Sequence, residues 1–500
     1  MRAIMVVGTA SHVGKSLITT ALCRLLSRRD WRVAPFKGQN MALNSYVTAT
    51  GGEIGYAQAV QAWAAGVSPQ TDMNPILLKP QGDMTSQVIL QGKAIATLSS
   101  TDYYETFFDQ GWQAIQESLH RLSQEYDVLV CEGAGSPVEI NLKHRDLTNM
   151  RVAQHLQAAT VLVADIERGG VFAHIVGTLD LMTPEERALM KGIIINKFRG
   201  QLEVLEPGLA WLTERTGLPV LGVVPWLTQA LPAEDSLSLT DRQPRAKQHT
   251  DITIAVIRLP RISNFTDFDP LEAEPNVRVV YLNPKDDLGY PDAVVIPGSK
   301  TTITDLLVLQ RSGMAEAIRD YVAAGGTVMG ICGGFQMMGE FLADPEGIEG
   351  QEGRFPAMNL FPMRTVITRQ KIARQRTISS HYPQDGLPVS GYELHQGRTQ
   401  LVLSEAEAQT GGKFQFLFED RSLGVVDSTQ SLWGTYLHGI FDNGPWRRAW
   451  LNRLRQQRGL GSLPTGIPNY REQREALLNS LADGVGAHLD SGPSPGYPLS

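Results

Sequence analysis

The feature that most constrains the fold is a glycine-rich loop near the start of the chain. The apolar run Ala3–Val7 predicts a buried strand, the loop Gly8–Ser16 (GTASHVGKS) follows it, and Leu17–Arg28 predicts a helix. This arrangement cradles phosphate, because the N–H groups of the loop and the helix dipole bind phosphate oxygens. A chance glycine turn is the alternative. We expect Lys15 to reach the terminal phosphates of ATP and Ser16 to ligate Mg²⁺. The full set expected at ATP is Gly8, Thr9, Ser11, Gly14, Lys15 and Ser16.

Strand-like and helix-like segments then alternate through the N-terminal half of the chain. Further strands are predicted at Arg32–Phe36, Asp127–Val130, Thr160–Ala164, Gly192–Ile195 and Pro219–Val224. Helices are predicted at Glu53–Ala65, Tyr103–Leu122 and Val171–Leu181. Such alternation predicts an α/β domain with a mostly parallel sheet.

Polar residues follow several of these strands, where open α/β sheets place their ligands. Glu132 lies just after the strand at 127–130 and precedes Gly-Ala-Gly, so we expect it to be a second Mg²⁺ ligand. Asn196 follows another strand and is a candidate contact for the nucleotide base. A turn is the alternative for both. Candidate substrate-facing residues lie in two polar loops: Lys37, Gln39, Asn40, Asn44, Glu139, Asn141 and Asp146.

The length of 500 residues predicts more than one domain. The polar, aperiodic stretch DRQPRAKQHTD marks a linker. We expect an N-terminal domain at 1–240, a linker at 241–250, a C-terminal domain at 251–455 and an extension at 456–500. From about Gly484 the chain is rich in Gly, Pro and Ser, which predicts disorder at its end.

The bulk composition limits the function classes. The net charge of −7 gives no support to a nucleic-acid-binding surface. Three cysteines suit a reducing compartment and exclude a disulfide framework. No apolar run has the length of a membrane span or of a signal-peptide core. We expect a cytoplasmic enzyme with small-molecule partners, whose oligomeric state stays open.

A second glycine-flanked turn dominates the C-terminal half, in Thr327–Gly339 (TVMGICGGFQMMG). Cys332 lies between a strand-like run and a helix-compatible run, with glycines at the spacing of a nucleophile elbow. A helix N-terminus there favours a thiolate. A buried structural cysteine is the alternative. Around it, strands are predicted at Ile252–Ile257, Val277–Tyr281 and Ala293–Ile296, and helices at Thr302–Gln310, Ala315–Ala324 and Trp446–Gln457.

A cysteine nucleophile needs a base, and His438 is the candidate. It follows a strand-like run in GTYLHGIF, roughly a hundred residues after Cys332. Cysteine–histidine pairs meet in space rather than in sequence. His381, His395 and His488 are the other histidines of this half.

The motifs PGSK (297–300), GICGGFQM (330–337) and YLHG (436–439) resemble the class I glutamine amidotransferase domain, in its cobyrinate-type branch. The resemblance implies a flavodoxin-like α/β fold and an oxyanion hole from Gly333 with Gly298 or Ser299. The usual triad has an acid two residues after the histidine, where this chain has Ile440. The branch lacks that acid, which leaves open what orients His438; a backbone carbonyl is one candidate.

The N-terminal half sharpens this resemblance. Five residues separate Gly8 from Gly14, as in dethiobiotin synthetase-like ligases. Together with PFKGQNMALNS, CEGAGSPVEINL, INKFRG and GYELHQGRT, the chain resembles the glutamine-hydrolysing cobyric acid synthase family over residues 1–455. That family implies amidation of the b, d, e and g carboxylates of adenosylcobyrinic acid a,c-diamide, with ATP, Mg²⁺ and glutamine, through an acyl phosphate and released ammonia. Alternatives are a cobyrinic acid a,c-diamide synthase, or a P-loop ATPase switch carrying an inactive amidotransferase domain.

Overall fold

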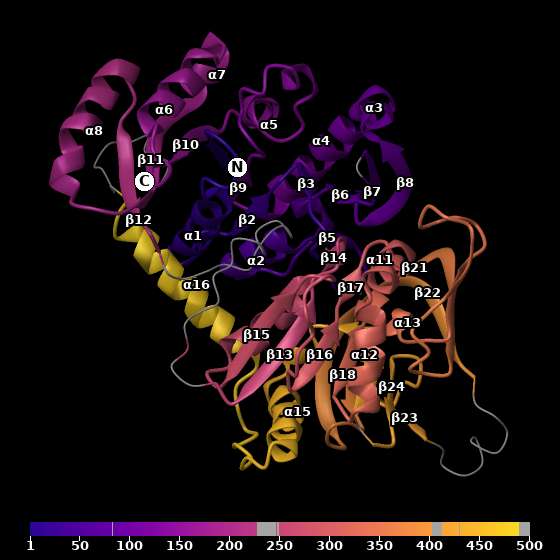
Figure 1. The fold of residues 1–500 in the computed structure, drawn as a ribbon. Helices are drawn as coiled ribbons and strands as arrows, with labels where there is room; N and C mark the ends of the chain where they lie inside the picture. Colours follow the sequence, from indigo (N-terminus) through magenta and orange to yellow (C-terminus); the bar gives the residue numbers. More distant parts are fainter. Residues whose placement is uncertain (83, 228–246, 248–249, 403–412, 430, 490–500) are drawn as a thin grey trace.

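The computed structural model places two α/β domains against each other, with a C-terminal helix that reaches back to the first domain (Figure 1). It describes residues 1–500 except 83, 228–246, 248–249, 403–412, 430 and 490–500. Of the predicted linker, only Lys247 and Thr250 are among the described residues.

The N-terminal domain is built on a six-stranded sheet in the order β12–β11–β10–β1–β9–β2. All neighbouring strands of this sheet run parallel, which confirms the predicted sheet type. Most of these strands are continuous apolar runs, as expected when both faces of a sheet are covered. The strands are β1 (Arg2–Gly8), β2 (Val33–Phe36), β9 (Val128–Glu132), β10 (Ala159–Asp165), β11 (Met190–Phe198) and β12 (Val220–Pro225).

Alternate residues of β1 face opposite sides of the sheet, as the period of a strand requires. Met5 and Val7 belong to the core on one face, and Ile4 and Val6 belong to the core on the other. The first core includes α4 (Phe108–Glu125), α5 (Met150–Leu156), α6 (Val171–Asp180) and α8 (Leu202–Thr216). The second includes α1 (Lys15–Ser27) and α2 (Tyr56–Ala64).

Two segments differ from the sequence prediction. The helix expected from Glu53 begins at Tyr56, because Glu53–Gly55 forms β5 and pairs with β4 (Ser45–Val47). The helix expected from Tyr103 begins with a π-helical turn, Tyr103–Phe107, before α4. A second small sheet has the order β3–β6–β7–β8, with β3 (Gln39–Met41), β6 (Ile76–Pro80), β7 (Thr85–Leu90) and β8 (Lys93–Ser99).

The C-terminal domain is built on a seven-stranded sheet in the order β15–β13–β16–β18–β25–β24–β23. Its first five strands run parallel and its last two are antiparallel. The strands are β13 (Ile252–Ile257), β15 (Val277–Leu282), β16 (Ala293–Ile296), β18 (Val328–Ile331), β23 (Phe414–Phe416), β24 (Gly424–Asp427) and β25 (Leu432–Thr435). Its helices include α11 (Thr302–Ser312), α12 (Met314–Ala323) and α15 (Gly444–Gln457).

A five-stranded sheet that the sequence analysis did not predict lies beside this core, in the order β20–β19–β21–β22–β26. It consists of β19 (Phe341–Asp344), β20 (Gly353–Pro356), β21 (Met363–Ser380), β22 (Leu387–Leu401) and β26 (Leu437–His438). The pairing of Tyr392 in β22 with His438 in β26 fixes the position of the candidate base.

The C-terminal segment returns to the N-terminal domain through α16 (Tyr470–Gly486), which packs on α1 (Figure 1). Leu478, Leu481 and Val485 are buried in the core that α1 shares with the sheet. The disorder predicted from Gly484 is therefore wrong as far as Gly486, because packing on α1 holds the helix there. Residues 490–500 lie outside the described residues.

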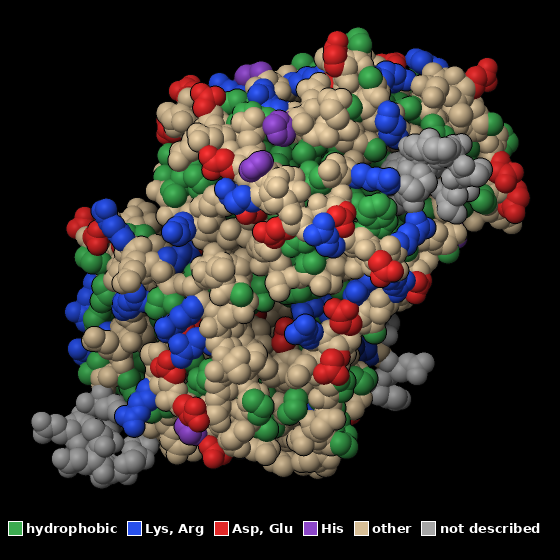
Figure 2. Space-filling model, turned by 180° about the vertical axis from the view of Figure 1, so that it is seen from behind, with side chains coloured by type: hydrophobic (Ala, Val, Ile, Leu, Met, Phe, Trp, Pro, Cys, Tyr) green, Lys and Arg blue, Asp and Glu red, His purple; other side chains and the backbone are tan. Residues whose placement is uncertain are grey.

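The surface carries charges of both signs. On the face shown in Figure 2, Lys and Arg side chains are interspersed with Asp and Glu side chains. In the part of the chain that the structure describes, no helix combines the length and the apolar character that crossing a membrane requires.

Candidate active sites

Cys332 occupies a sharp turn between β18 and the short helix α13 (Gly333–Met337). Its backbone has φ 51° and ψ −109°, a conformation that L residues rarely adopt and that marks strained functional positions. The residue is 7% exposed. The turn therefore presents the sulfur from a rigid, largely buried backbone.

The glycines around Cys332 are required by close contacts. A Cβ on Gly334 would lie 1.9 Å from the carbonyl oxygen of Ile296, and a Cβ on Gly330 would lie 2.6 Å from the nitrogen of Phe335. Both neighbouring atoms belong to the backbone and cannot rotate away. The elbow can therefore form only with glycine at these positions.

His438 lies beside Cys332 and is buried, with 1% exposure. The Cys332 sulfur is close enough to the imidazole to be one of the groups that raise the pKa of His438. The ring of Tyr392 stacks on the imidazole at a centroid distance of 5.3 Å, and the Cys332 Sγ lies 3.5 Å from the carbonyl oxygen of Leu394. The structure thus brings the predicted nucleophile and base together.

Asp267 orients His438. The imidazole Nδ1 lies 2.7 Å from Asp267 Oδ2, and the N–H of Gly439 donates to Asp267 Oδ1 at 2.8 Å. The suggestion that a backbone carbonyl orients the imidazole is therefore wrong. Sequence reasoning missed Asp267 because it precedes His438 by 171 residues; the signal was an acid within the aromatic run NFTDF (264–268), close after β13.

The charge state of His438 follows from these neighbours. Burial by itself lowers the pKa of the imidazole, but the charge and hydrogen bond of Asp267, together with Cys332, raise that pKa to about 10. His438 therefore carries a proton at neutral pH beside the sulfur. That proton is available to a leaving group, which is the task of a general acid.

The predicted oxyanion-hole residues surround this pair. Gly298 and Ser299 form β17, which pairs with β14 (Ile262–Ser263). A Cβ on Gly298 would lie 3.4 Å from His438 Cε1, and one on Gly333 would lie 2.9 Å from the nitrogen of Ser299. The backbone of all three residues thus borders the Cys332–His438 pair.

The phosphate-type loop lies at the carboxyl end of β1, as predicted. Gly14 has φ 104° before α1 begins at Lys15. The Lys15 ammonium donates to the carbonyl oxygens of Ala10 and Gly135, both at 2.9 Å. Lys15 therefore bridges this loop and the glycine-rich loop after β9. Of the other predicted ATP contacts, the N–H of Thr9 donates to Val163 O at 3.0 Å, and Ser11 is exposed.

Glu132 is the centre of a buried polar cluster next to this loop. Its Oε1 accepts from Ser16 Oγ and from Lys37 Nζ, both at 2.9 Å. Its Oε2 accepts from Gln61 Nε2 at 2.5 Å. The two predicted Mg²⁺ ligands, Ser16 and Glu132, are thus in contact. Gln61 was not predicted, since it lies inside a helix with no local motif.

Asn196 supports the loop rather than pointing away from it. Its Nδ2 donates to the carbonyl oxygen of Val13 at 2.8 Å, and a Cβ on Gly14 would lie 2.0 Å from the same nitrogen. The amide therefore braces the loop against β11. Contact with the nucleotide base stays a prediction.

The predicted substrate residues divide into four groups. Lys37, Gln39 and Asn40 are tied within the N-terminal domain, to Glu132, Tyr103 and Gln58 respectively. Asn44 Oδ1 accepts from the N–H of Phe265 at 3.0 Å, so it joins the two domains. Asp146 accepts three backbone N–H groups, from Thr148, Asn149 and Arg151. Only Glu139 and Asn141 are exposed, among these seven residues.

A buried charge cluster joins the domains near the cysteine. Glu53, 1% exposed, accepts from Lys79 at 2.7 Å and from Lys371 of β21. Burial raises the pKa of Glu53, but the two lysines outweigh this and hold it below its usual range. Burial and the charges of Lys371 and Lys79 lower the pKa of Lys300, which follows the oxyanion-hole segment.

The fold and both sites define a class of protein: a nucleotide-binding domain joined to a glutamine amidotransferase domain. Residues 4–238 match the family described as the CobQ/CobB/MinD/ParA nucleotide binding domain. Residues 253–446 match the CobB/CobQ-like glutamine amidotransferase domain. The chain belongs to the CobB/CobQ class of glutamine amidotransferases.

Full-length relatives narrow the class to one family. A cobyric acid synthase from Nostoc punctiforme is 68% identical over 494 residues, covering 99% of this chain and 99% of that protein. Those from Trichodesmium erythraeum and Synechococcus elongatus are 65% and 62% identical, again over 99% of each chain. The chain is a member of the cobyric acid synthase family, the glutamine-hydrolysing amide synthases of cobalamin biosynthesis. This assignment favours a cobyric acid synthase over a cobyrinic acid a,c-diamide synthase and over a P-loop ATPase switch with an inactive amidotransferase domain.

Proposed function

We propose that the C-terminal domain releases ammonia from glutamine and that the N-terminal domain uses it to amidate a corrinoid. The observation that carries the proposal is the strained Cys332 beside the buried His438–Asp267 pair. A thiol becomes a strong nucleophile as thiolate, and an imidazole fixed by a carboxylate moves protons in a defined direction.

In the proposed glutaminase cycle, the Cys332 sulfur attacks the amide carbon of glutamine and the carbonyl oxygen becomes an oxyanion. The N–H of Gly333, with that of Gly298 or Ser299, stabilises this charge. His438 gives its proton to the departing ammonia and leaves a thioester. It then takes a proton from water, which attacks the thioester and releases glutamate.

The proposed synthetase step overcomes the poor reactivity of a carboxylate toward ammonia. Transfer of the terminal phosphoryl group of ATP to the carboxylate gives an acyl phosphate, and ammonia displaces the phosphate. Such a transfer depends on positioning and charge neutralisation. In this step Lys15 would neutralise phosphate charge, and Asn196 would hold the loop in shape.

Ser16 and Glu132 would hold Mg²⁺. Their donor set fits, because a hydroxyl and a carboxylate are oxygen ligands of the kind that Mg²⁺ takes in nucleotide sites. A bound Mg²⁺ neutralises the charge that develops on the phosphates. Glu132 is also bonded to Lys37 and Gln61, so the metal would share this carboxylate with them. Among the described residues, no cluster of three or more His, Cys, Asp or Glu side chains forms another metal site.

The proposed substrate is adenosylcobyrinic acid a,c-diamide, with amidation at the b, d, e and g carboxylates to give adenosylcobyric acid. Mass spectrometry of the corrinoid product tests this. Four amides added to the a,c-diamide are expected. A product that stops at the a,c-diamide, formed from the unamidated acid, would contradict the assignment.

Two variants test the division of labour. Cys332→Ala should abolish glutamine-dependent synthesis and leave ammonia-dependent synthesis near the wild-type rate, because the ATP site is untouched. Lys15→Ala should lose synthesis with either nitrogen source, while Cys332 is still alkylated by a glutamine analogue. If high ammonia cannot rescue Cys332→Ala, or if Lys15→Ala retains ammonia-dependent synthesis, the proposed roles are wrong.

A further inference from the structure

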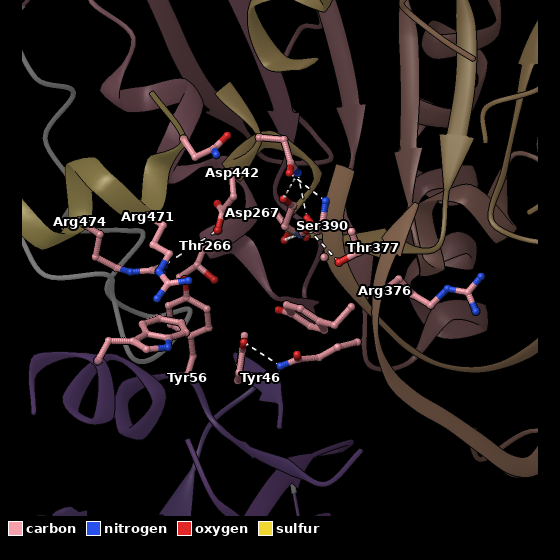
Figure 3. Close-up of a pocket in the computed structure, with 17 residues that line it drawn as sticks. Tyr46, Tyr56, Thr266, Asp267, Arg376, Thr377, Ser390, Asp442, Arg471 and Arg474 are labelled. Atoms are coloured by element: carbon pink, nitrogen blue, oxygen red, sulfur yellow. Dashed lines mark hydrogen bonds and ion pairs between the residues drawn. The ribbon is translucent and has the colours of Figure 1, made fainter. Parts of the chain in front are cut away.

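A cavity of about 480 Å³ lies where both domains and α16 meet (Figure 3). Tyr46 and Tyr56 come from the N-terminal domain, Ser390 comes from β22, and Arg471 and Arg474 come from the first five residues of α16. The volume is in the range of small-molecule sites. Among the described residues that line the cavity, neither the candidate nucleophile nor any P-loop residue appears.

Arg474 is the strongest sign that this cavity holds a ligand. Its side chain is 6% exposed, and its guanidinium points into the cavity and covers the ring of Trp63 at 3.7 Å. Its Nε and Nη1 hydrogen-bond to no described residue. Asp442 Oδ2 lies 4.0 Å from Nη1, which makes a long ion pair and no hydrogen bond. Buried charged donors without acceptors are costly, so the site calls for an acceptor.

The charges around the cavity favour an anion as that acceptor. Arg471 lies beside Arg474 on the same turn, and the N-terminus of a 17-residue helix adds partial positive charge. Of the two acids, Asp267 is held by His438 and the Gly439 N–H. Burial raises the pKa of Asp442 to about 6 against the opposing charge of Arg474, so this carboxylate is still ionised at neutral pH and offsets only one of the two arginines.

We propose that this cavity binds a small oxyanion, a carboxylate or a phosphate, through the guanidinium of Arg474. Planar guanidinium groups bind such ions through paired N–H donors. Two sources share this chemistry, inorganic phosphate and L-glutamate, and both are products of the proposed reaction.

The cavity shares a wall with the glutaminase site. Asp267 and Gly439 line it, and the same two residues hold His438. Tyr46, on the strand next to the interdomain contact at Ser45, lines the opposite side. An ion bound here therefore acts on the imidazole through Asp267. This regulatory step rests on the proposed function, whereas the binding step does not.

Fluorescence of Trp63 tests binding, because the guanidinium of Arg474 lies over its ring. The signal is the difference between the wild-type protein and Trp63→Phe. Sodium phosphate and sodium L-glutamate are titrated separately, with sodium chloride at equal ionic strength as the reference. We expect a saturable change with at least one of the two oxyanions. The arm that saturates at lower concentration identifies the source.

The variants decide whether Arg474 is responsible. Arg474→Gln should weaken binding at least tenfold. The control is Arg28→Gln, which removes an arginine that pairs with Asp483, a residue further along α16. This variant should bind the oxyanion as the wild type does. Thr377 also lines the cavity, so the larger side chain of Thr377→Phe should block binding too, and this variant serves if Arg474→Gln does not fold. An equal response to chloride, or wild-type binding by Arg474→Gln or Thr377→Phe, would overturn the proposal.

The regulatory step is tested on glutaminase activity at saturating oxyanion. We expect at least a twofold change in the wild-type rate and none in Arg474→Gln. Binding of the oxyanion without any change in the glutaminase rate would overturn the coupling to His438, but the binding site itself would stand. A protein that binds the oxyanion and lacks glutaminase activity altogether would overturn the proposed function and leave the site intact.

Discussion

Asp267 completes the arrangement of Cys332 and His438, and no local sequence motif predicts it. In the sequence, position 440 holds isoleucine, which is fully buried and cannot orient an imidazole. The turn Phe265–Phe268 supplies a carboxylate from the other side of the ring instead. The same carboxylate accepts the Gly439 N–H, so it fixes the backbone next to the histidine as well as the ring. We infer that Asp267 does the work of the triad acid.

Replacing Asp267 with asparagine tests this at the residue scale. The amide keeps the size of the side chain but removes the charge that raises the pKa of His438. We expect glutaminase activity to fall by about 10²–10⁴-fold, as when the acid of a catalytic triad is neutralised. Burial would then lower the pKa of His438, so the imidazolium is lost at lower pH and the alkaline limb of the glutaminase profile shifts to lower pH.

Ammonia-dependent synthesis is the control for Asp267→Asn, because it bypasses the C-terminal site. It should stay at the wild-type rate. A glutaminase pH profile that matches the wild type would show that Asp267 does not set the charge of His438.

Some residues of the two sites can be predicted from a short sequence motif, and others cannot. Cys332, Ser16 and Lys15 lie in strand–turn–helix units, where the local sequence determines the geometry. Glu132 follows a continuous apolar strand, which predicts the end of the sheet where it lies. Asp267 and Gln61 contact their partners only because of the tertiary fold, so the residues next to them in the sequence do not predict their roles.

The elbow is the element on which the glutaminase site depends. Gly334→Ala places a Cβ where only 1.9 Å separates it from the carbonyl oxygen of Ile296. Because β16 and the turn would have to move apart, we expect a loss of about 3 kcal/mol or more in the free energy of unfolding. Urea unfolding and alkylation of Cys332 measure the two effects.

Gly177→Ala is the matched control for the elbow. Gly177 lies inside α6, and a Cβ there would meet nothing within 4 Å. The substitution should stabilise the protein by roughly 0.5–1 kcal/mol, because alanine loses less backbone entropy in a helix. Equal stability of the two variants would show that the elbow tolerates a Cβ.

The elements differ in how well sequence predicts them. Strands such as β13 and β16 are found to the residue, because continuous apolar runs mark sheets buried on both faces. The α8 helix carries Pro207 in its interior, and α16 has a weak apolar stripe, so neither stood out. The hairpin of β21 and β22 has few apolar residues facing a core, and its register depends on the whole domain.

Removing one side chain of α16 tests its role in the N-terminal domain. Leu481 is fully buried against the face of the sheet that carries α1. Leu481→Ala should reduce the free energy of unfolding by about 2–5 kcal/mol through lost burial and the cavity left behind. Thermal unfolding with and without ATP measures it. Arg28→Gln breaks an exposed ion pair with Asp483 and an exposed hydrogen bond to Asn479 on the same contact, and should change stability by less than about 1 kcal/mol.

The two domains are joined by polar contacts beside a small apolar cluster, in which Val47 packs against Tyr392 and Leu394. Asn44 and Ser45 of the N-terminal domain accept hydrogen bonds from Phe265, Asn264 and Tyr392 of the C-terminal domain. The Glu53 cluster adds a buried ion pair across the same boundary. Such contacts fix orientation more than they add free energy. We infer that the interface serves to hold the glutaminase site in register with the ATP site.

Glu53→Gln tests that inference at the scale of the whole molecule. The amide leaves Lys79 and Lys371 buried without their counter-charge, which costs about 3–5 kcal/mol. Because the strain falls on the boundary, the domains should separate before either unfolds. We expect more glutamate released per amide formed, while ammonia-dependent synthesis stays near wild type. Arg32 forms an exposed ion pair with Asp127. The control Arg32→Gln should change neither the glutamate released per amide nor the rate of ammonia-dependent synthesis. An unchanged ratio of glutamate to amide in Glu53→Gln would show that the cluster does not hold the two sites in register.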